Sequence, residues 1–411
     1  MGCVVAAALA TRHPAVTQSL RDGILGSVLV FAGLYAVAIA WPGRGASALR
    51  WVSVWFGSLV VLYMLSAVYS PTPGAEALRP AAQLILIFAW LLFVYRTDRE
   101  QSSRIAAFAA LFGFLLVQGF LWARAGFPHP LTQTVATSAS MLSKNTLGAF
   151  AAAALFFMIV PLGARRMRVA RIIGVSSAVA LLWASGSRTP QVALLVAAGV
   201  YVSWPLLIRS KWVYQAVFLS WLVVGGAFVY YYVSLSRSES MARVAVEQVT
   251  GQGLYSGREL LWPVVLKYIG QRPLLGWGAG LDEGEVLLDA AIGPNVQGAS
   301  TMNAHNLFLA VALKTGLLGL FLQIAMLGSI WLKFYSGRYH PTVRLAAACF
   351  MGICVHQMFE TSLINTNLSI GILFWSIIAI GLRSSDSSAA AVRGGTPSER
   401  TSFASSYPMV R

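Results

Sequence analysis

The feature that most constrains this chain is a series of apolar runs, many of about 16–23 residues, that recurs along most of its length. A bilayer core takes roughly 20 residues of helix, and a helix satisfies its own backbone hydrogen bonds there. Charged residues make up only 11% of the chain, whereas a soluble domain carries roughly 25%. The alternating ten-residue segments of a transmembrane β-barrel are absent. The sequence therefore predicts an all-α fold, a polytopic transmembrane helix bundle.

Eleven spans are predicted, and residues 1–20 are a further candidate, so the bundle should have about 11–12 spans. The span that starts at residue 305 is longer than a bilayer needs, and the KTG sequence inside it predicts a break near Gly316. The predicted spans are 23–41, 51–69, 80–95, 105–122, 145–163, 172–186, 190–208, 213–235, 305–335, 345–358 and 368–382.

The connections between these spans divide into two sets by charge. The segment 163–171, GARRMRVAR, is dense in arginine and is predicted to be cytoplasmic, because Lys and Arg are enriched in cytoplasmic loops. Lys and Arg residues in the cytoplasmic loops of a membrane protein explain most of the net charge of +16. No basic stripe with interleaved aromatic residues lies outside the spans, so the charge does not indicate a nucleic-acid partner.

The chain should then have four parts. Residues 1–235 form N-terminal spans, 236–304 a large periplasmic loop, 305–382 C-terminal spans and 383–411 a cytoplasmic tail. The tail is rich in Ser, Ala and Gly and is predicted to be disordered.

The large loop has about 70 residues and holds half of the chain's 14 acidic residues. Ser256 and Glu259 have the spacing of a capping box, which predicts a helix with Arg258 in its first turn and a kink at Pro263. The glycine-rich GWGAG at 276–280 indicates a turn and no nucleotide site, because no strand precedes it. The loop is therefore predicted to be folded, partly helical and functional.

Polar residues also open three of the predicted spans on the same outer face. Lys144 and Asn145 open one span, and Arg188 precedes Thr189 and Pro190, which have the pattern of an N-cap and a first helical residue.

The third of these spans follows the sequence NAHNLFL. Asn303 is predicted to cap it, with His305 in its first turn and Asn306 beside it.

This pattern predicts a phosphate or pyrophosphate site at the outer membrane–water interface. Helix N-termini attract anions, and arginine offers paired donors that suit phosphate. His305 is the catalytic candidate because histidine exchanges protons near neutral pH. The alternatives are an arginine that anchors a span end and a structural histidine. His356 and Glu360 have metal-ligand spacing, but two ligands alone indicate a metal only weakly; Glu360 could instead pair with an arginine.

The order of five motifs resembles that of the O-antigen ligase and polymerase superfamily, over roughly residues 140–365. The motifs are SKNTLG, SGSRT, SGRELLW…RPLLGWGAG, HNLFLAVALKTGLLG and HQMFE. The resemblance implies an all-helical membrane glycosyltransferase that takes its glycan from a polyprenyl (undecaprenyl) diphosphate carrier without a cofactor or metal.

By position in these motifs, Arg188 and Arg258 would hold the donor diphosphate, and His305 would be the essential histidine, as base or as diphosphate ligand. The predicted substrate-binding residues are Lys144, Asn145, Asn306 and Glu360.

The resulting prediction is an O-antigen ligase in the bacterial inner membrane, with its site facing the periplasm. It would transfer polysaccharide, with inversion, to a hydroxyl of lipid A–core. An O-antigen polymerase or a protein O-oligosaccharyltransferase of the same superfamily is the alternative. A lipid or glycan transporter is a more distant one, because transporters place their polar sites near the midplane and this chain gathers its polar groups at one face.

Overall fold

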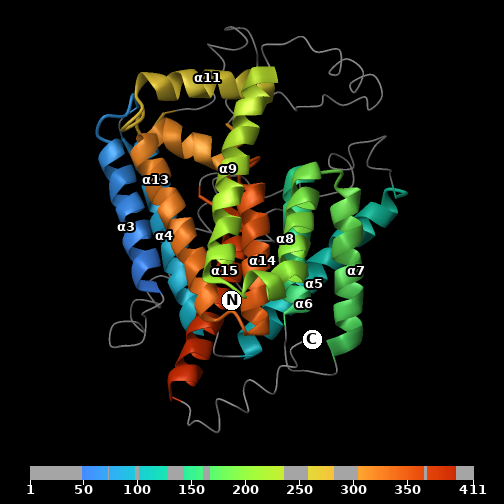
Figure 1. Ribbon diagram of the computed structural model, residues 1–411. Coiled ribbons are helices and arrows are strands. Elements are labelled where there is room, and N and C mark those ends of the chain that lie inside the picture. Colours follow the sequence, from blue (N-terminus) through green and yellow to red (C-terminus); the bar gives the residue numbers. More distant parts are fainter. Residues whose placement is uncertain are drawn as a thin grey trace.

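The computed structural model describes residues 49–72, 74–97, 101–127, 143–160, 167–235, 258–281, 304–364 and 368–394. All regular structure in these ranges is helical (Figure 1). The prediction of an all-α bundle is therefore confirmed. The elements are α3 (Leu49–Ser66), α4 (Ala75–Thr97), α5 (Gln101–Arg124), α6 (Lys144–Ile159), α7 (Arg168–Ala184), α8 (Arg188–Leu207), α9 (Lys211–Leu235), α11 (Arg258–Gln271), α13 (Leu307–Ser336), α14 (Pro341–His356) and α15 (Leu368–Gly394).

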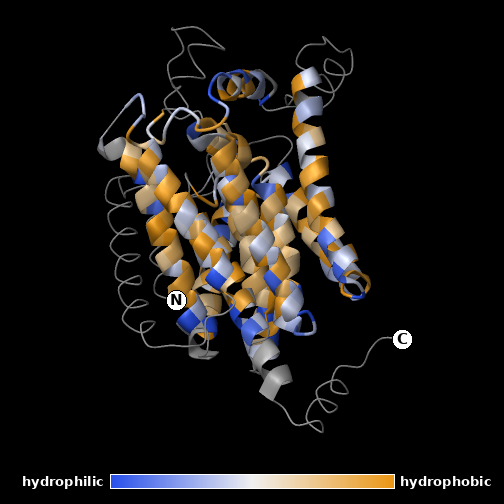
Figure 2. Ribbon diagram, turned by 60° about the vertical axis from the view of Figure 1, so that its left-hand side comes forward, coloured by the Kyte–Doolittle hydropathy of each residue, from blue (hydrophilic) through white to orange (hydrophobic). Residues whose placement is uncertain are grey.

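The chain is a multi-pass membrane protein. Within the described ranges, seven helices are long and apolar enough to cross a membrane, and α6 and α14 are shorter apolar helices. Figure 2 shows hydrophobic residues along the helices and hydrophilic residues gathered near their ends. The predicted spans from 51–69 onward each coincide with a helix. The candidates at 1–20 and 23–41 lie outside the described residues, as do parts of the large loop (236–257 and 282–303) and of the tail (395–411).

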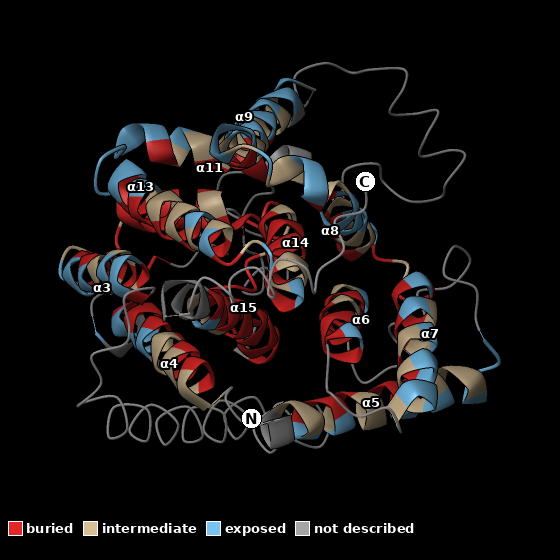
Figure 3. Ribbon diagram, turned by 60° about the horizontal axis from the view of Figure 1, so that its bottom comes forward, coloured by how far each residue is buried: buried red, intermediate tan, exposed pale blue. Residues whose placement is uncertain are grey.

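The bundle has a buried centre and a lipid-facing rim. In the most apolar stretch of α15, 89% of the residues are buried inside the bundle, whereas the corresponding share for α9 is 17%. Figure 3 shows this contrast between centre and rim. Small residues bring the central helices close: a Cβ added at Gly352 of α14 would lie 2.6 Å from the carbonyl oxygen of Ala193 in α8. Close backbone approach through small residues is the usual basis of helix packing in membranes, where apolar burial alone gives little preference.

The predicted break in α13 is confirmed at Gly316, whose φ of 68° and ψ of −168° are not helical. The segment 272–280 fills the break with backbone hydrogen bonds: the amide of Trp277 donates to Leu313 at 2.9 Å, and that of Leu317 donates to Pro273 at 2.7 Å. A Cβ at Gly316 would collide with the backbone of Leu274. Position 316 therefore requires glycine for two reasons: its φ is positive, and the backbone of Leu274 lies too close to leave room for a side chain.

Helix α11 lies across one end of the bundle, opposite the end where α7 and α9 begin (Figure 1). Its apolar side packs on α13 and α9, with Trp262 fully buried. The indole N–H of Trp262 donates to the carbonyl of Ala304 at 2.9 Å. This contact fixes α11 directly over the start of α13. The loop is thus partly helical, as predicted, within residues 258–281.

Candidate functional site

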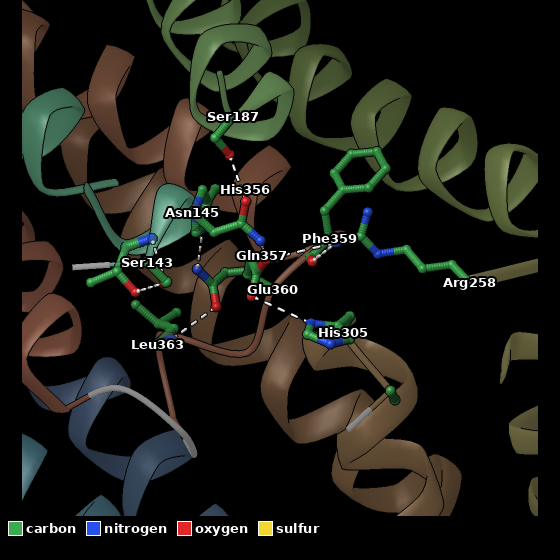
Figure 4. A network of polar contacts seen from close by, with 12 residues as sticks. Ser143, Asn145, Ser187, Arg258, His305, His356, Gln357, Phe359, Glu360 and Leu363 are labelled. Atoms are coloured by element: carbon green, nitrogen blue, oxygen red, sulfur yellow. Dashed lines mark hydrogen bonds and ion pairs between the residues drawn. The ribbon is translucent and has the colours of Figure 1, made fainter. Parts of the chain in front are cut away.

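The candidate site lies below α11, around the turn that follows α14. Figure 4 shows polar side chains from α6, α8, α11 and the start of α13 directed toward this turn. The turn is itself rigidly held. The backbone carbonyl of Gln357 accepts from the amide of Leu307 at 2.9 Å, and its buried side-chain oxygen accepts from the amide of Leu363 at 2.8 Å. The first residue of α13 is therefore tied to the turn.

Glu360 is at the centre of the cluster. Its Oε1 accepts a hydrogen bond from Asn145 Nδ2 at 2.7 Å. Its Oε2 lies 3.6 Å from His305 Nδ1, and Arg258 Nη2 lies 3.7 Å from Oε1. The side chains of Arg258 and Glu360 are 11% and 16% exposed, whereas His305 is 36% exposed. Of these three groups, His305 is the one that an incoming substrate can reach most easily.

The carboxyl group of Glu360 is held in its charged form. Burial raises its pKa, but the nearby His305 imidazole and the charges of His356 and Arg258 lower it by more. The net effect is a pKa below the ordinary value of a glutamate. The site therefore contains one carboxylate surrounded by basic side chains.

Asn145 links this carboxylate to a further helix. Its Nδ2 donates to Glu360, and its Oδ1 accepts from Ser187 Oγ at 2.8 Å. Arg258 makes a second link, because its Nη2 donates to the carbonyl of Phe359 at 2.7 Å. The starts of α6, α8 and α11 are thus joined through one turn.

His305 lies outside α13, so the prediction that it occupies the first helical turn is wrong. The helix begins at Leu307, and Asn306 caps it by accepting from the amides of Phe308 and Leu309. Asparagine is among the best N-cap residues, and its oxygen satisfies two otherwise unpaired amides. Asn303, the predicted cap, lies outside the described residues.

The capping role of Asn306 also bears on its predicted place in substrate binding. Its side chain is buried, and its oxygen accepts hydrogen bonds from amides in the first turn of α13.

The backbone of His305 has a φ of 45°, which few residues other than glycine adopt. Such conformations cost on the order of 1–3 kcal/mol and gather at functional sites.

The predicted start of α8 is also wrong by two residues. The helix begins at Arg188, and Ser187 takes the N-cap position without a side-chain capping bond. The hydroxyl of Ser187 instead donates to Asn145. Pro190 fits the first turn, where its missing N–H would have had no partner within the helix. Thr189 is therefore helical and is not the cap.

The other predicted site residues lie at the edge of the cluster. Lys144 and Arg188 are exposed at the first positions of α6 and α8, each next in sequence to a member of the cluster. Among the described residues, no group of three or more His, Cys, Asp or Glu side chains could hold a metal ion. His356 and Glu360 therefore have no third ligand of these types in the described part of the chain.

Sequence reasoning did not find Ser187, Gln357 or Phe359. Each stands in one of the motifs SGSRT and HQMFE, but only the contacts of the folded chain show what it does. The signal that could have pointed to Ser187 is its position directly before a helix that opens with arginine.

Comparison with known families supports the motif resemblance. Residues 173–324 match the family model described as O-antigen ligase, a segment that runs from α7 into α13 and includes Arg188, Arg258 and His305. Asn145 and Glu360 lie outside the matched segment. A comparison with curated proteins gives no match. Residues 173–324 of this membrane protein are therefore similar to O-antigen ligases, over 152 of the chain's 411 residues.

Proposed function

We propose that this protein is an O-antigen ligase, which transfers a polysaccharide from undecaprenyl diphosphate to a hydroxyl group of lipid A–core. The observation that carries the proposal is the convergence of His305 and Arg258 on one carboxylate beneath α11, with both basic residues inside the family match. A base and a cation at the edge of a membrane helix bundle suit a reaction between a lipid-borne diphosphate and a sugar hydroxyl.

The reaction proceeds by direct displacement. His305 accepts the proton of the acceptor hydroxyl while the hydroxyl oxygen attacks the anomeric carbon of the donor. The bond from that carbon to the diphosphate oxygen breaks, and its electron pair leaves with undecaprenyl diphosphate. Attack opposite the leaving group inverts the anomeric centre.

Negative charge grows on the diphosphate as this bond breaks. Arg258, together with Arg188 at the start of α8, would stabilise that charge, and the N-termini of α8 and α11 would add partial positive charge. Preorganised cations of this kind lower the barrier because they need no rearrangement during the reaction. The mechanism needs no cofactor or metal ion to neutralise the leaving group.

Glycan analysis of a strain that lacks the protein would test the reaction. We expect lipid A–core without long polysaccharide and polymer retained on the lipid carrier. The measurement is gel separation of lipopolysaccharide together with mass spectrometry of carrier-linked glycan, with restoration of the intact gene as control. A single repeat on lipid A–core would indicate a polymerase. Unchanged lipopolysaccharide with loss of glycan from protein Ser or Thr would indicate an O-oligosaccharyltransferase.

The same proposal places α11 and the site in the periplasm, because the arginine-rich start of α7 lies at the opposite end of the bundle. Lys267 is exposed on α11. We expect a Lys267→Cys variant to react with a membrane-impermeant maleimide in cells with a permeabilised outer membrane. Its matched control, Met167→Cys, should react only after the inner membrane is opened. The reverse labelling would put the site in the cytoplasm and contradict the proposal.

A further inference from the structure

We infer that Glu360, anchored by Asn145 and Ser187, is a positioning residue that holds His305 and Arg258 in place and does not itself bind substrate. The inference rests on the proposed function for the roles of His305 and Arg258. It changes the predicted roles of Asn145 and Glu360 from substrate binding to positioning.

The first argument is geometric. The two oxygens of Glu360 are shared between groups from three elements: Oε1 accepts from Asn145 of α6 and faces Arg258 of α11, and Oε2 faces His305 before α13. These groups are far apart in sequence, and no backbone segment connects them locally. The carboxylate is the common point that sets the distance between the proposed base and the proposed diphosphate-binding arginine.

The second argument concerns the anchor. Both ends of the Asn145 amide group are engaged, Nδ2 with Glu360 and Oδ1 with Ser187. These two bonds fix the orientation of the amide between Ser187 and the carboxylate, which is what an anchor requires. Ser187 is buried, so the chain from α8 through Asn145 to the carboxylate is fixed from inside the bundle.

The third argument is electrostatic. A carboxylate repels a diphosphate, so Glu360 is a poor ligand for the donor. Beside His305 Nδ1, the same charge has two favourable effects. It favours the tautomer with the proton on Nδ1, which leaves the lone pair on Nε2 for the acceptor hydroxyl, and it stabilises the imidazolium formed after proton transfer. Within the described part of the chain, the charged or titratable groups that act on Glu360 are His305, His356 and Arg258.

A kinetic test uses Glu360→Gln, which keeps the shape and removes the charge. We expect kcat to fall by about 10- to 1,000-fold, within the range for second partners of catalytic histidines, with little change in KM for donor or acceptor.

The matched control is Asp386→Asn, which removes a carboxylate that pairs with Lys333 at 2.8 Å. This pair lies in the C-terminal parts of α13 and α15, away from the site at the start of α13. The control substitution should leave kcat and KM unchanged. A Glu360→Gln enzyme with raised KM and unchanged kcat would show that Glu360 binds substrate, and would overturn the inference.

A second test needs no turnover. Protein labelled with ¹³C at glutamate carboxyl groups gives a Glu360 resonance that Glu360→Gln identifies by its loss. We expect His305→Gln and Asn145→Ala each to raise the pKa of Glu360, because each removes a partner of the carboxylate. His340→Gln, a histidine at the start of α14, is the control and should not change it. An unchanged Glu360 titration in both site variants would overturn the inference. Absence of glycan transfer by the wild type would contradict only the proposed function.

Discussion

Replacing His305 by alanine is expected to lower the rate of glycan transfer by about 100- to 10,000-fold, the range that a positioned general base contributes. The structure supplies two reasons. His305 is more exposed than Arg258 or Glu360, and its Nδ1 lies 3.6 Å from the carboxylate of Glu360. Stability should change little, because Glu360 retains Asn145 and Arg258 as partners. The measurement is transfer from a lipid-diphosphate donor by purified protein, expressed per folded molecule.

Backbone conformation has to be separated from chemistry in this test. The φ of 45° at His305 disfavours alanine, whereas asparagine tolerates it better. His305→Asn should therefore keep the local backbone and still lose activity. His340→Ala serves as the matched histidine control at the opposite end of the bundle, where His340 caps α14, and should retain the transfer rate. Near-normal transfer by His305→Asn would remove His305 from the mechanism.

Replacing Arg258 by alanine is expected to raise the barrier to transfer by about 2–4 kcal/mol, because a preorganised donor to developing charge is lost. Arg258→Lys should recover only part of the activity. The guanidinium donates to the carbonyl of Phe359 and also faces the carboxylate of Glu360. A lysine ammonium lacks the planar, paired N–H donors that allow arginine to make both contacts at once. The measurement is kcat/KM for the donor, alongside thermal unfolding of each variant.

Two further variants make this result interpretable. Arg188→Ala should also reduce transfer if the exposed side chain at the start of α8 meets the diphosphate. Arg344→Ala is the matched control: it lies at the other end of the bundle, where both Nε and Nη2 donate to the carbonyl of Tyr201. Full activity of Arg258→Lys and Arg188→Lys would show that bulk positive charge suffices and that paired donors are not required.

The helices were predictable because the information that specifies them is local. An apolar run of sufficient length has to satisfy its backbone within the membrane, so the run itself indicates a helix. The break at Gly316 was predictable for a related reason, since a glycine in an overlong span marks a place where the helix can end. The ends of α8 and α13 were less predictable, because several capping residues compete there. At α13 Asn306 is the cap, and at α8 the hydroxyl of Ser187 is used elsewhere.

The sequence by itself determined the membrane class of this protein, its helices, the polar residues at their ends and the motifs that resemble O-antigen ligases. It did not determine which of those polar residues meet. Asn145 and Glu360 are 215 residues apart, and Arg258 reaches a carbonyl 101 residues away. Such contacts depend on how helices pack and on the turn that Gln357 holds in place. Only the tertiary structure brings the proposed base and cation to one carboxylate, because side-chain geometry across helices is set by packing and not by local pattern.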